Sequence, residues 1–171
     1  DLEFEAQSVF GTLDKKHPGV NYLLNKSNKN YIGGKIESVS NPRHYDYKEL
    51  RHTPDELKSI FRSKGWDKIV AFQTRNPLHK AHFELTTKAM KELNANLLIH
   101  PVVGMTKPGD VNHYTRTRCY NHIMGEYPKN SAFLSLLPLA MRMGGPKETL
   151  LHAIIRKNYG CTHMIVGRDH A

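Results

Sequence analysis

The chain has 171 residues, 39% of them hydrophobic and 24% charged, which is enough to bury one medium-sized core and excludes a disordered polymer. Its formal net charge of +9 favours anionic partners, but the basic residues are dispersed, so small anions such as nucleotides, phosphate or sulfate fit better than nucleic acid. No apolar run is long enough to span a bilayer, and the acidic first residues do not resemble a secretory signal. Cys119 and Cys161 are isolated, as is typical of a reducing compartment, so we expect a cytoplasmic protein with no membrane partner.

Residues 1–45 differ in texture from the rest of the chain, being rich in Asn, Lys and Gly. Two short apolar pieces, NYLL (21–24) and YIGGKIESV (31–39), stand between turn-forming residues, a pattern typical of short strands. We interpret residues 1–45 as the end of a β-rich N-terminal domain and its linker, and residues 46–171 as the start of a second domain.

The second domain begins with a clear helix signal at residues 53–65 (TPDELKSIFRSKG). Thr53 is a good N-cap, Pro54 suits the first helical position, two acidic residues follow, and Gly65 ends the segment. We therefore predict an amphipathic helix here.

Apolar runs then alternate with helical segments. The predicted strands are 68–72, 96–103, 132–137 and 163–167, and the predicted helices between them are 78–93, 114–127 and 146–160. This alternation predicts an α/β fold with a doubly wound parallel sheet. Because the carboxyl ends of parallel strands share one edge, the unusual loops 73–77, 104–110, 138–145 and 167–171 are expected to meet there.

The turn after the first predicted strand (73–77) concentrates hydrogen-bond donors where a helix begins. Free main-chain N–H groups and the positive end of the helix dipole favour an anion at this point. Arg75 adds a planar fork of donors suited to an oxyanion, and Gln73, Thr74 and Asn76 add neutral donors. A strand–turn–helix junction alone is usually only structural.

His79 and His82 follow at spacing i, i+3, on one side of the predicted helix. Such a pair by itself is more often surface or core, and zinc is disfavoured because no nearby Cys or Glu completes a ligand set. Combined with the donor-rich turn, the pair indicates an anion site, and no metal site is expected.

QTRNPLHKAH (73–82) resembles the QTRNPxHxxH signature of the ATP sulfurylases (sulfate adenylyltransferases), a branch of the nucleotidyltransferase superfamily. Four further segments are similar to that family in the same order. They are LIHPVVGMTKPGD (98–110), LSLLPLAMRM (134–143), HAIIRKNYG (152–160) and VGRDHA (166–171). The resemblance runs from about Tyr31 to Ala171, most of the chain.

The resemblance implies a Rossmann-like nucleotidyltransferase core that transfers AMP from MgATP to sulfate, giving adenosine 5′-phosphosulfate and pyrophosphate. Mg²⁺ would arrive with ATP. Sulfate is already ionised, so catalysis would consist of positioning and charge stabilisation without a general base.

The resemblance also assigns residues. The catalytic residues would be Thr74, Arg75, Asn76, His79 and His82. The ATP-binding residues would be Gln73, Thr74, Arg75, Asn76, Gly167, Arg168, Asp169 and His170. The sulfate-binding residues would be Gln73, Arg75, Arg168 and Ala171. We expect the two arginines and the imidazole pair to enclose one pocket for a tetrahedral anion.

Family members begin with a complete β-rich domain and continue past GRDHA, so residues 46–171 are expected to be the truncated N-terminal part of the catalytic domain. The piece alone is expected to bind nucleotide weakly or not at all, and the full-length protein to form a homo-oligomer.

Two alternatives stay open: a nucleotidyltransferase with another acceptor, such as phosphopantetheine or nicotinate mononucleotide, and a basic nucleic-acid-binding module. Two arginines in one pocket favour a small dianion, and dispersed charge disfavours the second alternative.

Overall fold

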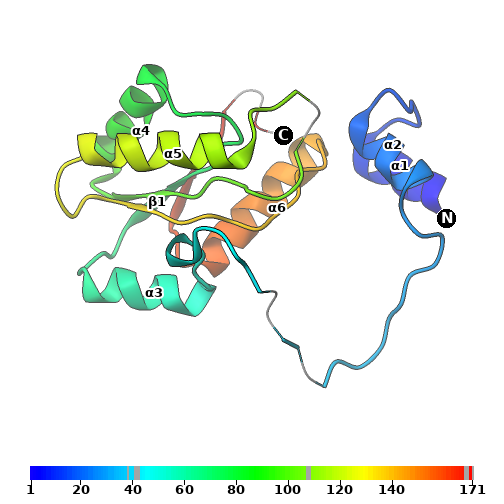
Figure 1. The fold of residues 1–171 in the computed structure, drawn as a ribbon, viewed down its shortest axis with the longest axis horizontal. Helices are drawn as coiled ribbons and strands as arrows, with labels where there is room; N and C mark the ends of the chain where they lie inside the picture. Colours follow the sequence, from blue (N-terminus) through cyan, green and yellow to red (C-terminus); the bar gives the residue numbers. More distant parts are fainter. Residues whose placement is uncertain (38, 41–42, 107–108, 168–169, 171) are drawn as a thin grey trace.

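A parallel β-sheet forms the centre of the protein (Figure 1), in a computed structural model that describes residues 1–37, 39–40, 43–106, 109–167 and 170. Its strands are β1 (Ile69–Phe72), β2 (Asn96–Ile99), β3 (Ala132–Leu134) and β4 (His163–Ile165), in the order β3-β2-β1-β4. All three neighbouring pairs are parallel. The predicted doubly wound parallel α/β fold is therefore confirmed.

Helices cover both faces of this sheet. They are α3 (Pro54–Ser63), α4 (Lys80–Leu93), α5 (His113–Ile123) with the short 3₁₀ turn η2 (Met124–Glu126), and α6 (Gly145–Asn158). Helices α4 and α5 lie on one side of the sheet and α3 and α6 on the other (Figure 1). The sheet and these helices thus form three layers.

Strand β1 shows how the sequence makes a two-sided core, since all four of its residues are buried. Val70 and Phe72 pack in the cluster that includes side chains of α4 and α5, whereas Ile69 and Ala71 pack with Leu57 of α3. Successive side chains of a strand point to opposite faces, so a continuous apolar run is what a sheet covered on both sides requires.

The second predicted strand is shorter than expected, because β2 ends at Ile99 and not at residue 103. Pro101 follows, and a proline has no N–H to donate to the ladder. Among the residues that the structure describes, parallel pairing then resumes as a single bridge between Val102 and Leu137.

Helix α3 starts as predicted, with a capping box in which the Thr53 hydroxyl accepts the Glu56 N–H and the Glu56 carboxylate accepts the Thr53 N–H. Helix α4 starts two residues later than predicted. His79 is its N-cap, with an extended backbone (φ −134°, ψ 177°), so His79 and His82 are not both inside the helix.

The N-terminal segment differs most from expectation. It contains two packed helices, α1 (Leu2–Phe10) and α2 (Pro18–Asn25), so the strand predicted at residues 21–24 is wrong. The imidazole of His17 accepts the first N–H groups of α2, Pro18 takes its first position, and Val20 and Leu23 then bury one face against α1. Residues 31–37 are extended without strand pairing, and the 3₁₀ turn η1 (Lys48–Leu50) leads into α3.

Within the described part of the chain, no helix is both long and apolar enough to cross a membrane.

Candidate functional site

The strand order places the reversal of the sheet between β1 and β4. From β1 the chain moves to β2 and then β3, and it returns to the opposite side of β1 as β4. Ligands of open α/β sheets bind outside the carboxyl ends of strands at such a switch point. A cavity of about 180 Å³ opens there. Its walls are Phe72, Gln73, Thr74, Arg75, Asn76, His82, Leu85, Met141, Ile165, Gly167 and His170.

The turn after β1 is held firmly by hydrogen bonds. The Thr74 hydroxyl accepts the Asn76 N–H at 3.0 Å, and the Thr74 carbonyl accepts the Val102 N–H at 3.2 Å. The Tyr120 hydroxyl donates to the Asn76 carbonyl at 2.8 Å. The loop after β2 and helix α5 therefore hold this turn before any ligand binds, which is the preorganisation that charge stabilisation needs.

Gln73 is buried, yet its amide is only partly satisfied. Its Oε1 has no hydrogen-bond partner among the described residues, and its Nε2 faces the sulfur of Met141 at 3.9 Å. A buried polar group without a partner costs free energy, so an amide left open at a cavity wall suits a polar ligand.

Arg75 lines the cavity but also forms an ion pair. Its Nη1 lies 2.5 Å from Oδ1 of Asp110, whose side chain is only 6% exposed, while that of Arg75 is 20% exposed. Oδ2 of Asp110 has no partner in the described chain. The sequence analysis placed the Asp110 loop at this edge but did not anticipate that its carboxylate would compensate the arginine.

The two predicted histidines are close together, with ring centroids 3.9 Å apart. His82 lines the cavity, whereas His79 does not. Burial lowers the pKa of His82, and the neighbouring His79 lowers it further, so the His82 ring is neutral at pH 7. Nδ1 of His82 is buried without a described partner.

The loop after β4 supplies the opposite wall through Gly167 and His170. Nε2 of His170 lies 3.2 Å from Nδ1 of His152 in α6. Burial, followed by the charges of His152 and Arg156, lowers the pKa of His170 to about 4. Three further predicted ligand residues, Arg168, Asp169 and Ala171, lie outside the described residues.

Two buried arginines beneath the same edge were missed by the sequence analysis. Arg116 Nη1 donates to the Val102 carbonyl and Arg156 Nη2 to the His100 carbonyl, each at 3.0 Å. Both side chains are almost fully buried, and neither pairs with a carboxylate among the residues described. They leave positive charge under the strand ends. Their sequence signal was weak, because a single arginine on a helix is usually exposed.

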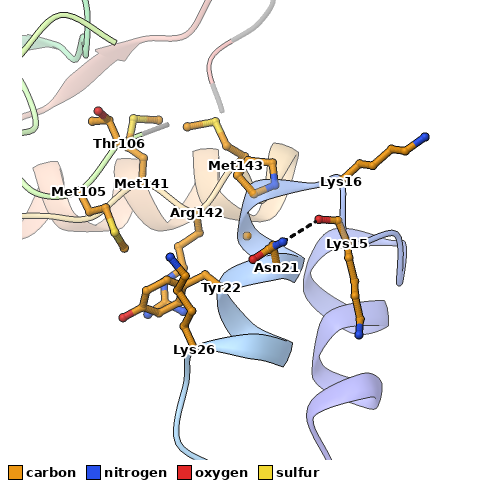
Figure 2. Close-up of a pocket in the computed structure, with 12 residues that line it drawn as sticks. Lys15, Lys16, Asn21, Tyr22, Lys26, Met105, Thr106, Met141, Arg142 and Met143 are labelled. Carbon is orange, nitrogen blue, oxygen red and sulfur yellow. Dashed lines mark hydrogen bonds between the residues drawn. The ribbon is translucent and has the colours of Figure 1, made fainter. Parts of the chain in front are cut away.

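A larger cavity, of about 510 Å³, lies between α2 and the segments 105–106 and 141–143 (Figure 2). Lys15, Lys16, Lys26 and Arg142 line it, but Figure 2 shows Lys15 and Lys16 extending away from the methionines of the opposite wall. Met141 borders both cavities. We place the candidate site in the smaller cavity, because the polar groups converge there.

A doubly wound parallel sheet with a polar cavity at its switch point is the class of α/β fold that binds small ligands at strand ends. The family model described as ATP-sulfurylase matches residues 48–171, and one described as a PUA-like domain matches residues 1–41. The chain belongs to the ATP-sulfurylase family.

Relatives with the name sulfate adenylyltransferase cover nearly the whole chain. The proteins of Schizosaccharomyces pombe and Saccharomyces cerevisiae are each 58% identical, over 171 and 167 residues, and that of Mycosarcoma maydis is 62% identical over 168 residues. These matches cover 100%, 98% and 98% of this chain but only 35%, 32% and 29% of the relatives, so the chain spans about a third of their length.

One solved structure that resembles the chain is described as a hexameric APS kinase from Thiobacillus denitrificans. It has a TM-score of 0.68 and 37% sequence identity, and the match covers 74% of this chain and 26% of that one.

Proposed function

We propose that this chain is part of a sulfate adenylyltransferase, which transfers AMP from MgATP to sulfate and yields adenosine 5′-phosphosulfate and pyrophosphate. The observation that carries the proposal is the switch-point cavity, where the donors of the turn after β1 face Gly167 and His170 of the loop after β4. Membership of the ATP-sulfurylase family and relatives of that name support it.

The proposed reaction is an in-line displacement. A sulfate oxygen forms a bond to the α-phosphorus, the bond from that phosphorus to the bridging oxygen breaks, and the electron pair leaves with pyrophosphate. Sulfate needs no deprotonation, so the protein supplies position and positive charge. Thr74, Arg75 and Asn76 form the catalytic turn, and His79 and His82 stabilise the charge that builds on the leaving phosphates.

Two sets of substrate-binding residues follow from this proposal. Gln73 and Arg75, with Arg168 and Ala171, hold sulfate. Gly167, Arg168, Asp169 and His170 complete the ATP site with the turn residues 73–76. A volume of about 180 Å³ is below the roughly 300 Å³ of typical small-molecule sites, so the cavity suits sulfate and phosphoryl groups, with the adenosine extending from it.

Sulfate that binds Arg75 meets a guanidinium that already donates a hydrogen bond to Asp110. The guanidinium has five N–H donors, and one of its terminal nitrogens faces the carboxylate in the ligand-free protein. We propose that sulfate binds the remaining donors or displaces the carboxylate.

The wider assignments are part of the same proposal. Residues 1–45 belong to the end of an N-terminal domain, which the separate PUA-like match supports, and residues 46–171 to the first part of the catalytic domain. The full-length protein is a cytoplasmic homo-oligomer; two free cysteines and a neighbour described as hexameric support this.

A sulfate-dependent exchange of pyrophosphate into ATP, measured on the intact protein, tests the function. We expect exchange that requires sulfate and magnesium. An exchange rate that does not depend on sulfate but increases with phosphopantetheine or nicotinate mononucleotide would instead identify a different acceptor. Tight nucleic-acid binding that weakens steeply with salt, without any exchange, would point to a binding module.

A further inference from the structure

The contact between Arg75 and Asp110 uses only one atom of each charged group. Nη1 of Arg75 donates to Oδ1 of Asp110 at 2.5 Å, and Oδ2 is buried without a hydrogen-bond partner among the described residues. An arginine and a carboxylate usually gain most from two parallel hydrogen bonds. A single bond between them therefore leaves part of the guanidinium open to another acceptor.

The open part is a defined edge of the guanidinium. Nη1 is the terminal nitrogen cis to Cδ, so the N–H bonds of Nε and Nη2 run parallel along the opposite edge. Nη1 is occupied by Asp110, whereas neither Nε nor Nη2 has a hydrogen-bond partner in the part of the chain that the structure describes. Two parallel N–H bonds match two oxygens of one oxyanion.

Arg75 and Asp110 are placed differently relative to the candidate site. Arg75 lines the switch-point cavity, whereas Asp110 is not one of its lining residues. Asp110 is also the more deeply buried of the two side chains. The carboxylate thus contacts the guanidinium from outside the cavity.

Helix α5 keeps Asp110 in a fixed position relative to the turn that carries Arg75. The N-cap of this helix is Asn112, two residues after Asp110, and its side chain accepts the Thr115 N–H at 3.0 Å. Further along the helix, the Tyr120 hydroxyl donates to the carbonyl of Asn76, the neighbour of Arg75, at 2.8 Å. The helix and the turn are therefore joined at two points, one of which is the ion pair.

An anion that displaced the carboxylate would leave Asp110 with an uncompensated charge. Because Asp110 is almost buried, that loss would be costly. An anion on the Nε–Nη2 edge keeps the ion pair intact and still receives two charge-assisted hydrogen bonds. The geometry therefore favours an anion that binds beside the pair.

We infer that Asp110 is a positioning residue, which holds Arg75 through Nη1 and so presents the Nε–Nη2 edge to two oxygens of sulfate. The inference rests on the proposed function, in which Arg75 binds sulfate, and it identifies the edge that does so. Sulfate binds with the carboxylate in place, and its affinity depends on Asp110 although Asp110 does not touch it.

Asp110→Ala in the intact protein is the direct test. Without the carboxylate, the guanidinium is no longer held in one orientation. We therefore expect the KM for sulfate to rise about tenfold and the KM for ATP to stay within about twofold of wild type. Sulfate-dependent exchange of pyrophosphate into ATP gives both constants.

Asp110→Asn should restore most of the affinity for sulfate. The amide Oδ1 still accepts from Nη1, and the amide nitrogen replaces Oδ2, which accepts no hydrogen bond from a described residue. We expect a KM for sulfate within about threefold of wild type, since the orienting hydrogen bond is kept. An Asn variant as defective as the Ala variant would show that the orienting bond is not what matters and would overturn the inference.

Two results for Asp110→Ala would also overturn it. A lower KM for sulfate would mean that the carboxylate competes with sulfate for Arg75. An unchanged KM for sulfate, or an equal rise in both constants, would mean that Asp110 has only a structural role.

Arg51→Ala is the matched control. Nη2 of Arg51 lies 2.7 Å from Oδ1 of Asp46 in a second arginine–aspartate pair, and neither residue lines the cavity. We expect this variant to have a lower urea midpoint and unchanged KM values for both substrates.

Arg75→Lys tests the edge itself and decides the inference if Asp110→Ala does not fold. The lysine ammonium keeps a positive charge beside Asp110 but has no pair of parallel N–H bonds. We expect the KM for sulfate to rise at least about tenfold. A KM for sulfate equal to that of wild type would overturn the inference.

Calorimetric titration with inorganic sulfate separates this inference from the proposed function. The intact protein is first saturated with α,β-methylene-ATP, which cannot release pyrophosphate. If wild type makes no adenosine 5′-phosphosulfate but binds sulfate more tightly than Asp110→Ala does, the proposed function is wrong and the inference is supported. If wild type makes the product and the two proteins bind sulfate equally, the inference alone is wrong. A wild type that binds no sulfate overturns both.

Discussion

At the scale of single residues, Arg75 faces both the candidate site and the carboxylate of Asp110. It points into the candidate site, and it also neutralises Asp110, a carboxylate that is almost buried. Removing one member of a buried pair leaves the other charge uncompensated, which is usually worse than removing both. The effects of Arg75 on activity and on stability can therefore be separated.

We expect Arg75→Ala to abolish sulfate-dependent exchange and to lower the free energy of unfolding by about 1–3 kcal/mol, because Asp110 loses its partner. Arg75→Ala combined with Asp110→Ala should recover most of that stability but no activity. Urea denaturation and the exchange assay measure the two properties. A double variant no more stable than the single one would show that the pair is not coupled.

His82 should matter more than His79, because only His82 lines the cavity. His82→Ala should reduce kcat by about 10²–10³-fold, as loss of a preorganised donor does, with a smaller change in ATP binding. His79→Ala and Lys80→Ala are measured in the same way for comparison. The side chain of Lys80 is exposed and next to His79 in the sequence, so Lys80→Ala is the control. Equal losses in both histidine variants would contradict the geometry.

At the scale of elements, the sequence predicted what local signals determine. The capping residues of α3 and the apolar run of β1 led to correct elements, because caps and buried strands are encoded over a few residues. The apolar run in α2 is too short for its period to distinguish helix from strand, and its burial against α1 decided the outcome. The Arg75–Asp110 pair depends on a contact between two loops, which no local pattern encodes.

The loops after β2 and β3 approach closely at Gly104, where a Cβ would lie 2.4 Å from the carbonyl oxygen of Leu139. Nearby, the Met141 N–H donates to the Met105 carbonyl at 2.8 Å. We expect Gly104→Ala to separate the loops and to lower the free energy of unfolding by about 1–3 kcal/mol. Gly125→Ala, where a Cβ meets nothing within 4 Å, is the matched control. Equal urea midpoints for the two variants would disprove the close approach.

At the scale of the whole molecule, one buried and three half-buried histidines make stability depend on pH. Burial lowers the pKa of His52, His82, His100 and His170. Each ring binds its proton more weakly in the folded protein than in the unfolded chain, where the pKa is about 6.5. As pH falls through that value, the unfolded chain takes up protons first, so the folded state loses stability.

We therefore expect the urea midpoint to be constant above about pH 7.5 and to fall steadily from about pH 6.5 towards pH 5. His170→Asn should flatten part of this slope, since the pKa of His170 is lowered to about 4. A second decrease should begin below about pH 4.5, because Asp46, Glu56 and Glu148 have lowered pKa values. A midpoint unchanged from pH 8 to pH 5 would contradict this account.

The place of β4 beside β1 has a consequence for biosynthesis. β4 is the last of the four strands to leave the ribosome, yet its partner β1 is the first. Until residues 163–165 emerge, one edge of an entirely apolar strand has unpaired N–H and C=O groups, which invite pairing with other nascent chains. A ribosome stalled before His163 should therefore retain a bound chaperone that leaves once Ile165 has been released from the exit tunnel.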